Sequence, residues 1–198
     1  FRNLTTNEYR IYAWGNNAFG QLGDGDTRDR DTPTKIGTKN NWIKVAAGNN
    51  HSLALDDSGV VYAFGSNSNG QLGINATTNK LTPVTTFVGG TTWAQVSHGG
   101  NHVGAIKTDG TLWTWGSQSL GTGNLGINVS GNTRATPVTT FAGGTNWKQV
   151  SAGERSTVAV KSTQSSTPSI PVTNYKDNNG IDLGRKLVTQ AYYNDIQS

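Results

Sequence analysis

Three segments of the chain repeat one pattern of hydrophobic and polar residues. In each, two large side chains flank a small one and a glycine follows, which gives I-Y-A-W-G from Ile11, V-Y-A-F-G from Val61 and L-W-T-W-G from Leu112. Alternation with a period of two predicts β-strands. Because apolar residues occupy both faces of each segment, we expect strands that are covered on both sides, as central strands of packed sheets are.

Two further motifs recur downstream of each predicted strand. They are a Thr-Pro pair, at Thr32, Thr82 and Thr136, and a W-x-x-V-x-x-G block, at Trp42, Trp93 and Trp147. The aromatic-Gly positions are 50 and 51 residues apart, and the Thr-Pro pairs are 50 and 54 residues apart. A period near 50 residues with about four short strands per unit is typical of a β-propeller blade. The wider third spacing comes from extra residues between strands, where repeat proteins tolerate insertions.

Within one unit we expect four strands. Three are predicted at 93–97, 103–107 and 111–115, and the Asp109-Gly110 dipeptide between the last two is a strong hairpin signal. A short fourth strand is expected after Pro83, with Val84, Thr86 and Phe87.

The recurring string W-G-x-N-x-x-G-Q-L-G, followed by Thr-Pro and V-x-x-G-x-x-H, resembles the repeat of the regulator-of-chromosome-condensation propellers. The resemblance covers about residues 10–161, which is three periods. It implies a ring that family members usually close with seven blades. Members include nucleotide exchange factors, secreted inhibitors of β-lactamase, and bacterial and viral proteins of unknown role, so this fold alone constrains function weakly.

The sequence therefore predicts an all-β fold, a partial propeller of three four-stranded blades, with an extended linker and a short C-terminal helix. The expected parts are a lead-in at 1–9, repeats at about 10–59, 60–110 and 111–161, a linker at 162–173 and a docking segment at 174–198. Three blades leave two apolar blade faces open. Either further blades outside the chain or other subunits must cover them, and the open ends are expected to pair with each other or with another copy.

The predicted C-terminal helix has one apolar face and Asp182 as its N-cap. Its candidate partner-docking residues are Leu183, Leu187, Val188, Ala191, Tyr192 and Ile196. The helix either packs on its own propeller or docks on another protein. The string D-L-G-R-K-L-V-T-Q-A-Y-Y at 182–193 resembles a short module of tailed-bacteriophage structural proteins, which favours docking on another virion subunit.

Composition agrees with a virion appendage and with a turn-rich β fold. Gly, Thr, Asn and Ser make up 89 of the 198 residues, and Cys and Met are absent. The six Trp, six Tyr and five Phe supply buried area that a disordered chain lacks. The chain begins with Phe1, so we expect a processed product or part of a longer protein, and we find no signal peptide.

Charge and hydropathy exclude two classes of partner. The net charge of +4 is spread over residues 60–161 without a basic cluster, so nucleic-acid binding is not expected. No run of 18 apolar residues exists, so no membrane span is expected.

The sequence predicts neither a metal site, nor a cofactor, nor an enzyme. Residues 24–31 hold four acids, but Arg28 stands where a calcium loop needs an oxygen ligand, so we expect a solvated turn that Arg28 and Arg30 balance. His51 and His102 occupy the same repeat position, where the third unit has Ser156, which indicates a packing role. No serine stands in a nucleophile-elbow sequence.

Three functions remain open at this stage. The favoured one is a non-enzymatic structural or adhesive component of a bacteriophage virion, which binds other virion proteins or copies of itself. It would contact a host surface receptor through loops 24–31, 74–81 and 117–134. The alternative is a secreted or surface bacterial propeller, extracellular, that acts as a protein-binding or inhibitor module. A nucleotide exchange factor is the third, although a basic chromatin-binding tail is missing.

Overall fold

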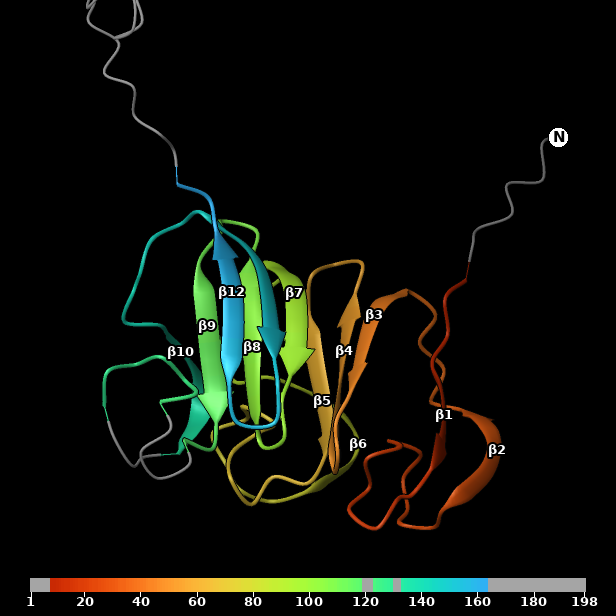
Figure 1. Ribbon diagram of the computed structural model, residues 1–198. Coiled ribbons are helices and arrows are strands. Elements are labelled where there is room, and N and C mark those ends of the chain that lie inside the picture. The colour runs from red at the N-terminus through yellow and green to blue at the C-terminus, as the bar shows by residue number, and fades with distance from the viewer. Residues whose placement is uncertain (1–7, 119–122, 130–132, 164–198) are drawn as a thin grey trace, which may run out of the picture. The chain divides into compact units, whose positions relative to one another are not determined.

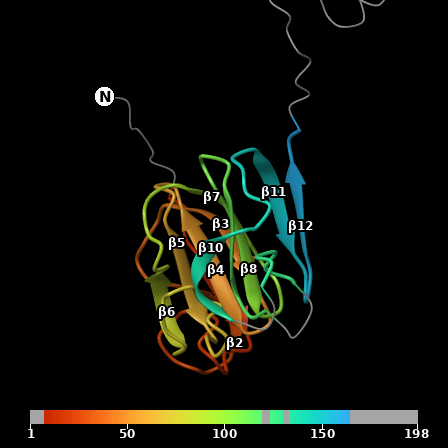
Figure 2. The ribbon, with the colours of Figure 1, turned by 90° about the vertical axis from the view of Figure 1, so that its left-hand side faces the viewer.

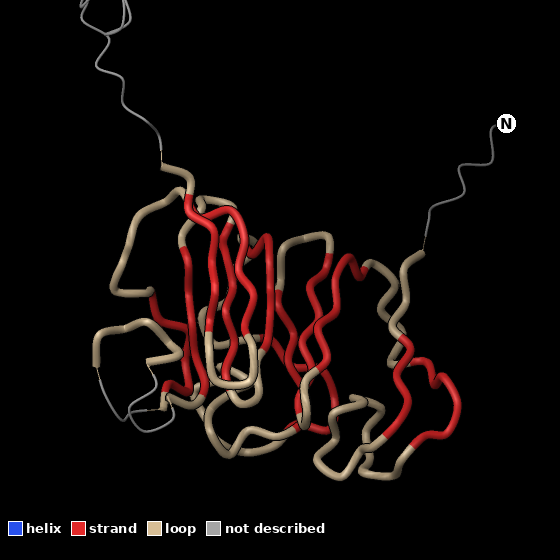
Figure 3. The backbone as a smooth tube through the Cα atoms, in the orientation of Figure 1, coloured by secondary structure: helices blue, strands red, loops and turns tan. Residues whose placement is uncertain are grey.

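The computed structural model describes residues 8–118, 123–129 and 133–163. These residues form strands and loops and no helix (Figure 3). The predicted C-terminal helix, nearly all of the predicted linker and all six candidate docking residues lie outside the described residues.

Twelve strands are present in the described residues, as three four-stranded blades require. They are β1 (Tyr12–Gly15), β2 (Arg30–Lys35), β3 (Trp42–Ala47), β4 (His51–Asp56), β5 (Val61–Gly65), β6 (Lys80–Thr85), β7 (Trp93–His98), β8 (His102–Lys107), β9 (Leu112–Gly116), β10 (Arg134–Thr139), β11 (Trp147–Ala152) and β12 (Thr157–Lys161). The all-β propeller architecture is confirmed (Figure 1).

The strands are distributed as two complete blades and two half-blades. The complete blades are the antiparallel sheets β3-β4-β5-β6 and β7-β8-β9-β10. The half-blades are the hairpin β11-β12 and the pair β1-β2. By repeat position, β1-β2 is the outer half of a blade and β11-β12 is the inner half. The four strands that would make a third blade are therefore divided between the two ends of the repeat array, with β1-β2 at one end and β11-β12 at the other.

The fourth strand of each unit begins earlier than the sequence predicted. Pro83 lies inside β6 rather than before it, and Pro33 and Pro137 lie inside β2 and β10. These strands form the outer edge of each blade, where a proline without an N–H breaks no inner ladder. The pairing of β5 with β6 is also irregular between Ala63 and Gly65, opposite the proline segment. Thr86 and Phe87, expected in this strand, follow its end.

Neighbouring blades pack face to face. Strand β7 contacts β3 and β4 of the preceding blade, and β11 contacts β7 and β8; Figure 2 shows β11 beside β8. The main core between the two complete blades consists of Leu53, Leu55, Val61, Ala63, Leu72, Trp93, Val96, Val103, Ala105 and Trp115. A smaller cluster joins the β1-β2 half-blade to the first complete blade, with Ile11, Ile36, Trp42, Ala54 and Phe64. Each fully buried large side chain contributes about 1.5–3 kcal/mol relative to exposure.

A buried asparagine organises the long loop after the third strand of a blade. The Nδ2 atom of Asn67 donates to the carbonyl oxygens of Ala76 and Thr78, at 2.8 and 3.1 Å, and its Oδ1 accepts from the amide of Leu72 at 2.9 Å. Asn17 makes the equivalent bonds in the first unit. Gln118 replaces this asparagine in the third unit and donates to the carbonyl oxygen of Val129. In the first two units, these hydrogen bonds therefore hold the two sides of the loop together.

Candidate protein-interaction surfaces

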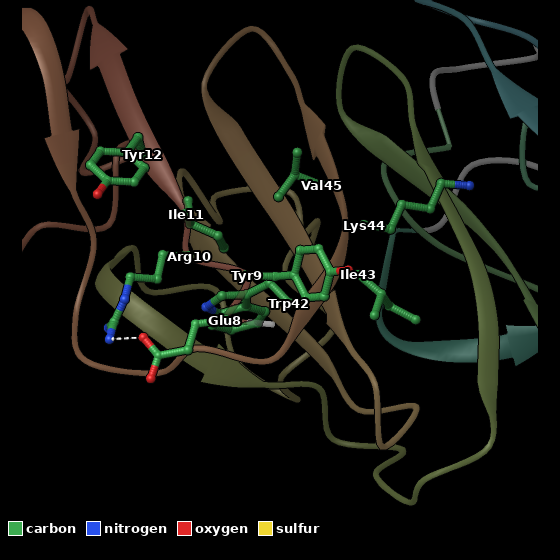
Figure 4. A pocket seen from close by; sticks show the side chains of 9 residues that line it. All are labelled: Glu8, Tyr9, Arg10, Ile11, Tyr12, Trp42, Ile43, Lys44 and Val45. Carbon is green, nitrogen blue, oxygen red and sulfur yellow. Dashed lines mark hydrogen bonds and ion pairs between the residues drawn. The ribbon is translucent and has the colours of Figure 1, made fainter. Parts of the chain in front are cut away.

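The N-terminal open end is an apolar surface formed by Tyr9, Tyr12, Trp14, Ile43 and Val45, all of which are exposed. A hollow of about 660 Å³ lies at this end. It is lined by residues 8–12 of the lead-in and β1 and by residues 42–45 of β3, whose side chains Figure 4 shows. Glu8 and Arg10 form an ion pair of 2.5 Å at its margin (Figure 4). A surface with several large apolar side chains side by side is typical of a protein contact.

The exposure of this end follows from the pairing of β1 with β2 alone, because no inner strands complete that blade among the described residues. Val45 on β3 is 59% exposed, whereas Val96 at the same repeat position is 1% exposed because it packs in the core between the complete blades. Trp14 on β1 is 59% exposed, whereas Trp115 at the same repeat position is fully buried. These residues have the composition of a blade interface, but the described residues contain no blade to cover them.

The segment before β1 also marks the place of the missing strands. The amide of Trp42 donates to the carbonyl of Tyr9 at 3.2 Å, as the amide of Trp93 donates to Gly59 and that of Trp147 to Gly110. Gly59 and Gly110 belong to the turn between the second and third strands of a complete blade. Tyr9 therefore occupies the position of that turn, from which the inner strands would continue.

The C-terminal open end is formed by the outward face of β12, with Val158 and Val160. Val158 is 68% exposed, whereas Leu53 at the same repeat position is 1% exposed. A hollow of about 360 Å³ lies beside β12 and is lined in part by Leu112, Leu125 and Trp147. In the complete blades the next blade fills this position, so this end also presents an uncovered blade interface.

The inner hairpin loops of three successive units meet in a polar hollow. It has a volume of about 110 Å³ and is lined by Asn49, Gly100, Asn101, Ser117, Asn124, Glu154 and Arg155. Backbone hydrogen bonds fix its walls, since the amide of Ser117 donates to the carbonyl of Asn101 at 2.8 Å. Glu154 and Arg155 are exposed, whereas the equivalent residues of the first two units are uncharged. This rim is a second, polar surface for contacts.

The histidines pack between blades, as their repeat positions predicted. His51 is completely buried, and its ring lies 5.0 Å from the ring of His98 in an edge-on arrangement. Burial, together with the smaller effects of the nearby His98 and His102, lowers the pKa of His51 to about 3. Nε2 of His102 lies 2.9 Å from Oγ1 of Thr157 on β12. His51 is therefore neutral at ordinary pH and part of the core.

Two of the four acids at 24–31 form ion pairs with arginines, which agrees with the prediction that Arg28 and Arg30 balance acids of this turn. Asp26 pairs with Arg28 at 2.8 Å and with Arg30 at 2.9 Å, and Asp24 also pairs with Arg30. The amide of Arg28 and both arginine side chains lower the pKa of Asp26. Among the described residues, no group of three or more His, Cys, Asp or Glu side chains has an arrangement that would hold a metal ion.

The sequence did not single out the residues of the two open ends, although it predicted uncovered blade faces. The available signal was the repeat itself, because a residue at an interface position in an incomplete unit lacks its neighbour.

No helix in the described part of the chain has the length and hydropathy needed to cross a membrane.

Comparison with known proteins identifies the type of repeat. Residues 10–55 and 58–106 match the regulator of chromosome condensation (RCC1) repeat, and residues 42–71 match a second description of it. The fold is that of an RCC1-repeat propeller. The chain superposes on Prp20p from Saccharomyces cerevisiae with a TM-score of 0.68 and 22% sequence identity, over 78% of this chain and 40% of that structure.

The curated relatives of the chain include an ultraviolet-B receptor and an RCC2 homologue. The chain is 35% identical to the ultraviolet-B receptor UVR8 of Arabidopsis thaliana, over 76% of this chain and 34% of that protein. It is 37% identical to an RCC2 homologue of Danio rerio, over 65% of this chain and 26% of that protein. The chain thus spans about a third or less of these relatives. The resemblance of residues 182–193 to a phage module lies outside the described residues.

Proposed function

We propose that this chain is a non-enzymatic protein-binding module that binds by blade completion, with strands of another polypeptide joining its open ends. One observation carries the proposal. Trp14, Val45, Val158 and Val160 are exposed at the ends of the repeat array, whereas the residues at the same repeat positions, Trp115, Val96, Leu53 and Leu55, are buried between complete blades. Prp20p, whose propeller this chain superposes on, binds Gsp1p and histones, so a propeller of this type can serve protein binding.

Backbone geometry supports the same mode of binding. Strand β12 pairs with β11 on one side, and β1 pairs with β2 on one side, so each has an edge that no other strand of the described chain covers. An open strand edge presents unpaired N–H and C=O groups and accepts an added strand readily. The apolar residues beside each edge would then be buried together with the backbone ladder.

A virion subunit is the more specific form of this proposal. The composition and the resemblance at 182–193 support it, whereas the relatives named above are a receptor and an RCC2 homologue of cellular organisms. A secreted or surface bacterial module would use the same open ends. For contact with a host surface, loops 24–31 and 74–81 offer rigid rims held by Asn17 and Asn67.

Amide hydrogen exchange tests blade completion. In the native assembly isolated from its source, the amides of β1 and β12 are expected to exchange as slowly as those of β5 and β8, because a paired strand protects its amides. The isolated chain at high dilution is expected to lose this protection at β1 and β12 alone. Rapid exchange of both edge strands in the native assembly would contradict the proposal.

A further inference from the structure

We infer that the two open ends of this chain bind each other in trans, so that β12 of one copy pairs with β1 of a second copy. This inference rests on the proposed function and names its partner. Among the described strands, β11-β12 supplies the inner pair that is absent beside β1-β2, and β1-β2 supplies the outer pair that is absent beside β11-β12. Joined in this order, they form one four-stranded blade with the same strand order as β3-β4-β5-β6.

The complete blades give the register of this pairing. Leu53 on β4 lies opposite Ala63 on β5, and Gly104 on β8 lies opposite Thr114 on β9. By repeat position, Val158 on β12 therefore lies opposite Ala13 on β1 of the second copy. The flanking pairs bring Thr157 opposite Trp14 and Ala159 opposite Tyr12, since their equivalents pair in both complete blades.

Side-chain packing at the joint matches the pairing of the backbones. Val150 on β11 lies over Gly104 of the preceding blade, because a Cβ built on Gly104 would be 2.7 Å from Cγ2 of Val150. Val158 is the residue equivalent to Gly104, and Val45 is the residue equivalent to Val150. In the joined assembly, Val45 of the second copy would therefore cover Val158, and two exposed valines would be buried together.

A third contact comes from the aromatic residue before each repeat glycine. A Cβ on Gly23 would lie 2.7 Å from the ring of Phe64, and a Cβ on Gly73 would lie 2.8 Å from the indole of Trp115, so each glycine receives the aromatic ring of the next blade. A Cβ on Gly126, the third such glycine, would have only Thr140 near it, at 3.9 Å. Trp14 of a second copy supplies the ring that Gly126 lacks.

Closure within a single copy does not fit the blade arrangement. Strands β1 and β12 belong to opposite ends of the row of blades (Figure 1), and two complete blades lie between them. Propellers typically contain four to eight blades. A ring of three blades is smaller than this range, whereas a ring of six blades lies within it. Two copies joined at both ends form a closed ring of six blades, in which a two-fold axis relates the two identical joints.

Engineered disulfides test both the pairing and its register. The chain contains no cysteine, so the variant with Ala13→Cys and Val158→Cys carries only the introduced pair. Residues opposite each other on antiparallel strands have Cα atoms about 4.5–5.5 Å apart, within the range that a disulfide spans. Under mild oxidation by oxidised glutathione we expect a covalent dimer on a non-reducing gel, at about twice the chain's 21.0 kDa. The control variant, with Ala13→Cys and the equally exposed Phe141→Cys, is expected to stay at the mass of one chain.

The other outcomes separate this inference from the proposed function. A disulfide inside one chain, or a ladder of higher multiples, would overturn the two-copy ring. Slow exchange at β1 and β12 in the native assembly without any disulfide-linked dimer would mean that a different polypeptide covers the ends, so the inference would fail while the proposed function stands. Fast exchange at both strands would overturn both.

Discussion

The indole N–H of Trp115 donates a hydrogen bond of 2.9 Å to the carbonyl oxygen of Gln71, which lies 44 residues earlier in the chain. Trp115 belongs to one blade and Gln71 to the loop of the preceding blade. The bond satisfies the one polar atom of a completely buried side chain. It shows how the repeat connects blades, with an aromatic residue of each unit seated on the glycine-containing loop of the unit before it.

Gly73 makes this contact possible, and its replacement is expected to destabilise the fold. Its φ of +67° is unfavourable for other residues, and a Cβ would lie 2.8 Å from Nε1 of Trp115. We expect Gly73→Ala to lower the free energy of unfolding in urea by about 1–3 kcal/mol. Gly89→Ala is the matched control, because its φ is not positive and a Cβ there would approach no atom more closely than 3.9 Å. Equal stability of the two variants would contradict this account.

Asn67 is expected to be as important for the loop as Gly73 is for the blade contact. Asn67→Ala removes three hydrogen bonds and leaves the amide of Leu72 without its partner in a buried position. We expect a loss of about 1–3 kcal/mol in the free energy of unfolding. Thr77→Ala, an exposed position in the same loop, is expected to change it by less than about 0.5 kcal/mol. A loop that tolerates Asn67→Ala would show that other contacts hold it.

Acid is expected to destabilise the blade interface through His51. Its pKa in the folded state is lowered to about 3, mainly by burial, whereas an unfolded chain has an ordinary histidine pKa near 6.5. Below pH 6.5 the unfolded state therefore binds more protons, and the free energy of unfolding falls by up to about 1.4 kcal/mol per pH unit until pH approaches 3. Stability should be full above pH 7.

Urea unfolding between pH 4 and 8 measures this dependence. The variant His51→Asn is expected to lose the part of the slope that His51 contributes, and His102, whose pKa is also lowered by burial, should leave a residual slope. An unchanged slope in His51→Asn would mean that other groups control the acid sensitivity.

Calcium is expected to have no effect on the loop at 24–31. Arg30 already pairs with both Asp24 and Asp26, so a cation would have to displace an ion pair to bind there. The melting temperature should be the same in millimolar calcium and in a chelator. A rise of the melting temperature in calcium that Asp26→Asn abolishes would show that residues 24–31 bind calcium, against the prediction from the sequence.

The sequence predicted the parts of the fold that depend on the repeat. The spacing of the aromatic-Gly motifs predicted the blade period, and the third strand of each blade lies where this motif predicted it. The start of β6 at Lys80 could not be predicted in the same way, because a proline usually argues against a strand interior and only its outer-edge position permits it.

Which residues are exposed at the open ends could not be predicted from the sequence and required the structure. Val45 and Val96 have the same sequence motif around them, and only the absence of a neighbouring blade makes one exposed and the other buried. The docking residues predicted at 183–196 lie outside the described residues and stay a prediction.

The mass of the assembly in solution tests head-to-tail closure most directly, with Val45→Lys and Val158→Lys as the two probes. Both side chains are exposed in the single chain, so neither change should impair folding, and each blocks one end. The matched control Phe87→Lys removes an equally exposed apolar side chain away from both ends. By light scattering, the unmodified chain and this control should have about twice the mass of one chain, 21.0 kDa.

Each blocked variant alone should have the mass of one chain, and an equimolar mixture of the two should recover the doubled mass through its one intact joint. A monomeric unmodified chain, or a doubled mass that survives in either blocked variant alone, would contradict closure of the blade between two copies.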